Sequence, residues 1–138
     1  MLQLIFHGIG DFFLQTDYQA LNKKKKGRLG LKQCLIHCTT YSLPFLFIAS
    51  WKAVLAIFIT HFIIDRTNIV AYALAIKNNV LKPFKIGNKI VYHVGGFHYD
   101  ISNFGFGKEK PFAMSIWLYI ITDNLCHIIC NYLSIMYL

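Results

Sequence analysis

Four long apolar segments constrain this chain more than any other feature, because they leave little polar surface for a fold in water. They cover about residues 2–21, 31–50, 51–76 and 111–138. Charged residues make up only 14% of the chain, whereas soluble domains contain about 25%. A membrane-spanning helix needs roughly 20 mainly apolar residues to cross the hydrocarbon core. The pattern predicts an all-α polytopic membrane protein, with four transmembrane helices in a single membrane domain over residues 1–138.

The basic residues predict the orientation of these helices. The net charge is +8, from 14 Lys and Arg against 6 Asp and Glu. Most of the basic residues lie between apolar segments, so an anionic membrane face is a better partner for them than nucleic acid. Because cytoplasmic loops carry the excess of Lys and Arg, we expect the cytoplasmic (inner) membrane and cytoplasmic basic loops. These loops contain Lys23, Lys24, Lys25, Lys26, Arg28 and Lys32, then Lys77, Lys82, Lys85, Lys89, Lys108 and Lys110.

The loop insertion at residues 77–110 is rich in Gly, Asn and Lys. Residues 90–94 and 97–101 flank the pair Gly95-Gly96, which predicts a β-hairpin with a two-residue turn before the last helix. A hairpin there would act either as a lid over the cytoplasmic mouth of the bundle or as a plain connector.

Three of the six acidic residues lie inside apolar segments, and each has a histidine four positions away. Four residues is just over one helical turn, so both members of a pair share a helix face. An ionised Asp at the centre of a span costs about 2.5–3.5 kcal/mol. The pairs should therefore face the interior of the bundle. They are His7/Asp11, His61/Asp65 and Asp123/His127.

Two further polar residues extend this set. Gln15 lies one turn beyond Asp11, and His37 adds an imidazole in the second segment. Counted from the cytoplasmic ends of their segments, the three aspartates lie at one depth of about 16 Å, at 1.5 Å per residue. The sequence thus predicts a single polar layer, reached from the cytoplasm.

Imidazoles and carboxylates are ligands for zinc, manganese and iron. We expect one or two divalent transition metal ions, with His37 as a further ligand or general base and Gln15 orienting a ligand or the substrate. A bound metal activates water near neutral pH. The set predicts a metal-dependent hydrolase acting on a phosphoester-type or lipid-linked anionic substrate. The expected metal ligands are His7, Asp11, His61, Asp65, Asp123 and His127.

Two other functions fit the same residues. In the first, the His/Asp pairs are structural and the chain is a non-enzymatic membrane effector, of the phage superinfection-exclusion or anti-defence type, which binds a host membrane protein through the 77–110 loop. In the second, the polar layer conducts protons or ions. Four helices make a small wall around a polar centre, so a homo-oligomer is expected in each case.

The order of these motifs resembles an uncharacterised integral-membrane family of bacteria and phages, described as a domain of unknown function. That resemblance implies a small helical membrane protein with a polar His/Asp set, and it implies no activity. Asn124 and Asn68 depart from the usual Gln and Lys of the family. The resemblance rests on the motif from His7 through Asp11, Phe12 and Gln15 to Asp17, on His37 with Tyr41, on Thr60 to Asp65, and on Asp123, Asn124 and His127.

Overall fold

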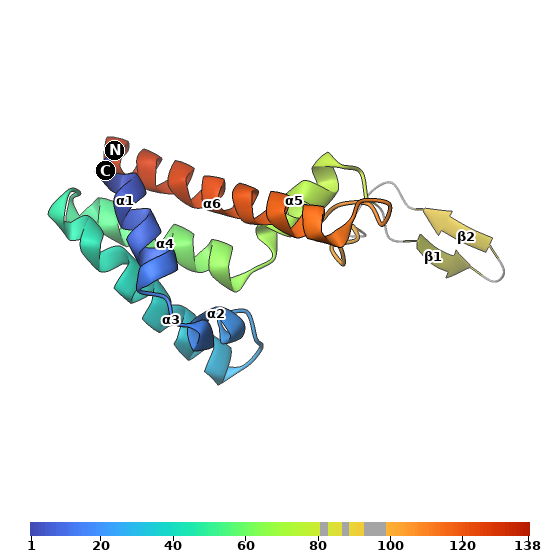
Figure 1. Ribbon diagram of the computed structural model, residues 1–138, viewed down its shortest axis with the longest axis horizontal. Coiled ribbons are helices and arrows are strands. Elements are labelled where there is room, and N and C mark those ends of the chain that lie inside the picture. The colour runs from blue at the N-terminus through green and yellow to red at the C-terminus, as the bar shows by residue number, and fades with distance from the viewer. Residues whose placement is uncertain (81–82, 87–88, 93–98) are drawn as a thin grey trace. The chain divides into compact units, whose positions relative to one another are not determined.

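The computed structural model describes residues 1–80, 83–86, 89–92 and 99–138, with side chains for residues 1–80 and 99–138. The described chain is mostly helical, as predicted, with one short antiparallel hairpin (Figure 1). The elements are α1 (Leu2–Gly8), a π-helical turn (Ile9–Phe13), α2 (Asp17–Asn22), α3 (Arg28–Ser42), a 3₁₀ helix (Leu43–Phe47), α4 (Trp51–Arg66), α5 (Ile69–Lys77), β1 (Pro83–Ile86), β2 (Lys89–Tyr92) and α6 (Phe112–Tyr137).

Three of the four predicted apolar helices are interrupted. The first segment breaks before α2, where Thr16 forms a capping box: its hydroxyl accepts from the Gln19 amide, and the Gln19 side chain accepts from the Thr16 amide. The second tightens into a 3₁₀ helix that contains Pro44, because proline cannot donate the next α-helical hydrogen bond. The third breaks at Thr67, which is extended.

The described chain divides into two compact units, Met1–Thr67 with Asn124–Leu138, and Asn68–Asp123. In the first unit, the chain termini lie beside each other (Figure 1). Its core contains three fully buried residues, Tyr41, Phe45 and Ile57, with Phe6, Ile48, Val54 and Ile135 packed around them. The prediction of a single membrane domain over the whole chain stays a prediction.

Gly10 permits the π-helical turn to pack closely on α3. A Cβ added at Gly10 would overlap the ring of Tyr41, whereas one added at Gly8 would meet nothing within 4 Å. We expect Gly10→Ala to destabilise the protein by about 1–3 kcal/mol, the usual range for overpacking. Chemical unfolding in detergent measures this effect, with Gly8→Ala as the matched control. Equal stability of the two variants would contradict the close packing.

The second unit contains a hairpin that lies earlier in the sequence than the predicted one. Strand β2 includes residues 90–92, but it pairs with β1 before it, in a register that places Phe84 opposite Val91. Residues 93–98, which include the predicted Gly95-Gly96 turn, lie outside the described residues. The two residues between β1 and β2 in the sequence are Gly87 and Asn88, a dipeptide that is itself typical of hairpin loops. The predicted pairing of residues 90–94 with residues 97–101 stays a prediction.

Helix α6 is the one helix among the described residues that is long and apolar enough to cross a membrane alone; α4 with α5 would make a second span if counted together. Only 11% of its apolar window is buried, unlike the core helix of a water-soluble protein. On its second half Leu125, Ile129 and Leu133 are about half exposed, while His127 and Asn131 are buried. Apolar side chains thus face outward and polar ones inward, as a lipid environment favours.

Candidate metal centre

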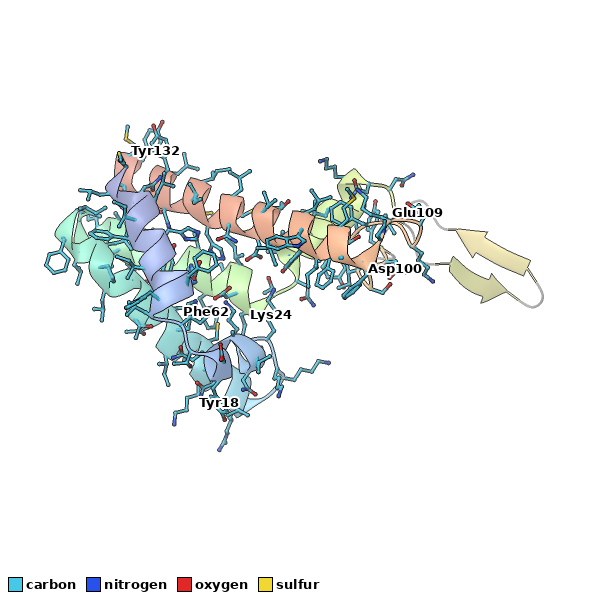
Figure 2. The ribbon with its side chains drawn as sticks, in the orientation of Figure 1. Tyr18, Lys24, Phe62, Asp100, Glu109 and Tyr132 are labelled. Atoms are coloured by element: carbon cyan, nitrogen blue, oxygen red, sulfur yellow. The ribbon has the colours of Figure 1, made fainter. Side chains whose placement is uncertain are left out.

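Four histidines and two aspartates come together in the first unit. They lie on four helical stretches that contact one another through polar side chains, namely α1 with its π-helical turn, α3, α4 and the second half of α6 (Figures 1 and 2). Asp11 is partly exposed, and the other five are buried. The six residues are His7, Asp11, His37, His61, Asp65 and His127.

The centre of this cluster is a triangle of three potential ligand atoms. His37 Nε2 lies 3.0 Å from His61 Nε2. Asp65 Oδ2 lies 3.1 Å from His37 Nε2 and 3.2 Å from His61 Nε2. Asp11 Oδ1 lies 3.2 Å from His37 Nε2 and 3.5 Å from His61 Nε2. Two triangles of ligand atoms therefore share the edge between the two imidazoles.

These distances fit the spacing of ligands around a metal ion. Bonds of about 2.0–2.2 Å in tetrahedral geometry place ligand atoms roughly 3.3–3.6 Å apart, close to the edges of both triangles. Three ligands from one triangle leave a fourth position, as catalytic zinc sites do. Asp11 Oδ1 is buried and has no hydrogen-bond partner among the described residues, so a cation would supply the interaction that it lacks.

The balance of hydrogen-bond donors and acceptors at the centre also favours a bound cation. Two Nε2 atoms 3.0 Å apart that bond to each other share one hydrogen, so one of them presents its lone pair to the other. Ionised carboxylate oxygens are acceptors only, and two of them approach the same nitrogens. Lone pairs of two carboxylate oxygens and of one imidazole nitrogen therefore meet at the centre. A cation, either an extra proton or a metal ion, would stabilise this arrangement.

Lys23 supplies one positive charge to this cluster. Its Nζ donates to Asp65 Oδ2 at 2.8 Å, with the lysine side chain 15% exposed and the aspartate side chain 3% exposed. The sequence analysis placed Lys23 only in a juxtamembrane basic cluster. No sequence signal distinguishes it from the three lysines that follow. With neutral histidines, two carboxylates and one ammonium carry a net charge of −1.

A hydrogen-bond chain holds His7 beside the cluster. Asn131 Nδ2 donates to the Tyr41 hydroxyl at 2.7 Å. The hydroxyl is then free to donate to His7 Nδ1, 2.8 Å away. The remaining nitrogen, Nε2, lies 3.0 Å from Asn124 Oδ1, to which it donates. Asp11 Oδ2 is farther from His7 Nδ1, at 3.4 Å. Both ring nitrogens of His7 are thus engaged, which favours a positioning role over ligation.

The remaining predicted site residues have different positions. His127 Nε2 lies 3.7 Å from Asp65 Oδ1, and His127 also forms a group of potential ligands with Asp11 and His61. Gln15 lies in the break between the π-helical turn and α2, and no contact places it in the cluster. Asp123 belongs to the second unit, one turn before His127 on α6. The ligand roles of Gln15 and Asp123 stay predictions.

Asn131 is a site residue that the sequence analysis missed, and Tyr41 entered it only as part of the family resemblance. Tyr41 is fully buried, and its ring stacks on His61 with the ring centroids 3.6 Å apart. Asn131 follows His127 by four residues, so the periodicity that revealed the His/Asp pairs also marks Asn131. The buried hydroxyl of Tyr41 had no comparable signal, because aromatic residues are common at membrane interfaces.

Together these features define a helical protein with one helix of membrane-spanning length and a buried His/Asp cluster that is able to hold a metal ion. The chain belongs to the family described as Protein of unknown function (DUF3307), which it matches over residues 1–137. No curated protein and no solved structure matches the chain. The predicted membership of an uncharacterised family is confirmed, and the family description supplies no activity.

Proposed function

We propose that the chain is a membrane-embedded, metal-dependent hydrolase that acts from the cytoplasmic face on a phosphoester-type or lipid-linked anionic substrate. The observation that carries the proposal is the convergence of His37 Nε2, His61 Nε2 and Asp65 Oδ2 to within 3.0–3.2 Å of one another. A divalent transition metal, zinc, manganese or iron, would satisfy these atoms and offset the carboxylate charge. Bound water at the open position would then be the nucleophile.

Each residue has a role in this proposal. His37, His61 and Asp65 form the ligand triangle, and Asp11 completes it or holds a second ion with His127. His37 is therefore a ligand rather than a general base. His7 is fixed by Tyr41, and its ring, 3.4 Å from Asp11 Oδ2, limits the positions open to that carboxylate.

The proposal includes four membrane crossings in the inner membrane with cytoplasmic basic loops. The 26 residues of α6 give about 39 Å at 1.5 Å per residue, more than enough for one crossing. Adjacent termini agree with an even number of crossings. The broken helices α1 and α3 line a polar centre, where interruptions in membrane helices are tolerated because neighbouring groups satisfy the free backbone.

Metal analysis of the detergent-purified chain tests this function. We expect close to one equivalent of zinc, manganese or iron per chain, or two if Asp11 and His127 hold a second ion. Asp65→Asn should lose most of the metal, because the amide is a neutral and weaker ligand, and with it hydrolysis of a generic phosphodiester. Asp17→Asn, at an exposed carboxylate on α2, is the control and should retain both. Metal-free wild-type protein with an intact fold would remove the hypothesis.

A second function, proton conduction, has one specific observation in its favour. His37, Asp11, His7 and Tyr41 form a continuous series of contacts at 3.2, 3.4 and 2.8 Å, and such chains of imidazoles and carboxylates carry protons in membranes. Proton flux in liposomes that disappears in Asp11→Asn would support conduction, and absence of flux in the wild type would exclude it.

A further inference from the structure

We propose that Lys23 competes with the metal ion for Asp65, and that metal binding releases its ammonium to bind the anionic group of the substrate. This inference rests on the proposed function and identifies a residue that determines substrate class. The inference is based on one oxygen atom, Asp65 Oδ2, which has two roles. Asp65 Oδ2 accepts a hydrogen bond from Lys23 Nζ at 2.8 Å, and the same oxygen is the carboxylate corner of the ligand triangle.

The position of Lys23 is built into the fold. The residue follows directly after α2, with its amide bonded to the Gln19 carbonyl at 2.8 Å. Arg66, the neighbour of Asp65, donates from Nη1 to the Lys23 carbonyl at 3.3 Å. The backbone is thus held against the end of α4, while the ammonium is attached through a flexible four-carbon stem. The side chain is able to move without any movement of its backbone.

The net charge of the cluster determines whether the Lys23 ammonium stays on Asp65 when a metal ion binds. With neutral histidines, Asp11, Asp65 and Lys23 carry a net charge of −1. A divalent ion added beside a retained Lys23 gives +1, whereas an ion that displaces the ammonium leaves the metal and two carboxylates neutral. Like charges on either side of one oxygen repel, and Lys23 already reaches solvent at 15% exposure. Displacement toward water is therefore the favourable response to metal binding.

A displaced ammonium would stay close to the metal because its backbone is fixed. A compact point charge on a flexible stem suits a phosphate group. Released at the edge of the centre, Lys23 would bind the negative oxygens of a phosphoester while the metal holds the reacting one. In the metal-free protein Lys23 thus stabilises the Asp65 carboxylate. In the metal-bound protein it selects an anionic substrate.

Cobalt(II) binding to the detergent-purified full chain tests the competition, followed by its visible absorption. Lys23→Met keeps the length of the side chain and removes the charge, and Lys25→Met, at an exposed lysine, is the control. We expect Lys23→Met to bind cobalt roughly tenfold more tightly than wild type or better, because the repulsion between like charges is gone. Lys23→Arg keeps the charge, so its affinity should be no higher than that of wild type.

Inorganic phosphate, titrated into the cobalt-loaded protein, tests the second step. Phosphate should bind at least several-fold more weakly to Lys23→Met than to wild type or to Lys25→Met. Unchanged or weaker cobalt affinity in Lys23→Met overturns the competition, and unchanged phosphate affinity overturns the release. If neither wild type nor Lys23→Met binds cobalt, the metal site of the proposed function is wrong as well.

Discussion

Replacement of His61 with alanine should abolish metal retention by the purified chain. His61 belongs to both ligand triangles and also to the group with Asp11 and His127, so no arrangement of ligands in the first unit keeps its geometry without this imidazole. Loss of an outer hydrogen-bond partner of a ligand lowers metal affinity by roughly 10- to 100-fold. Loss of a shared ligand should exceed that range and remove hydrolysis with it.

Elemental analysis after dialysis measures this effect, with Thr60→Ala as the control on the same helix. The Thr60 hydroxyl bonds only to backbone carbonyls of its own helix, including that of Ala56 at 2.9 Å, so its loss should leave the metal in place. His61→Gln fills most of the space under Tyr41 and separates loss of the ligand from loss of packing. Full metal content in a folded His61→Gln variant would contradict the proposed ligand set.

The periodic pairs were predictable because a helix fixes the relation between residues four apart. His61 and Asp65 lie on one face of α4 and meet at 3.2 Å, and His7 and Asp11 meet at 3.4 Å even though a π-helical turn carries Asp11. The tertiary contacts of these pairs were not predictable from the helical spacing. His37 had no acidic partner in its own segment, yet it lies between both aspartates at the centre of the cluster.

The interruptions in the helices and the role of Lys23 depended on tertiary context. Apolar composition alone suggested continuous spans, although Thr16 and Gln19 carry a capping-box spacing that marks the start of α2. Lys23 is one of four consecutive lysines, and only its contacts with Asp65 and Arg66 distinguish it from the others. Local patterns therefore identified candidate ligands, and long-range packing determined which cationic side chain lies beside them.

Removal of the Tyr41 hydroxyl should lower the stability of the protein even though the aromatic ring still fills the core. In Tyr41→Phe, Asn131 loses its acceptor and His7 loses its donor. Each buried group left without a partner costs about 1–3 kcal/mol. Tyr41→Ala also removes a fully buried ring that stacks on His61, and large-to-small changes of aromatic core residues cost about 3–5 kcal/mol.

Unfolding in detergent should rank the variants as wild type, then Tyr41→Phe, then Tyr41→Ala. Tyr132, labelled near the C-terminal end of α6 in Figure 2, is 51% exposed, so Tyr132→Phe and Tyr132→Ala are the matched controls. A metal assay separates the two functions of the hydroxyl. Because Tyr41 fixes His7 and His7 contacts Asp11, Tyr41→Phe should weaken metal binding even where the protein is fully folded, by roughly the 10- to 100-fold typical of an outer partner. A stable Tyr41→Phe variant with wild-type metal affinity would show that His7 needs no such support.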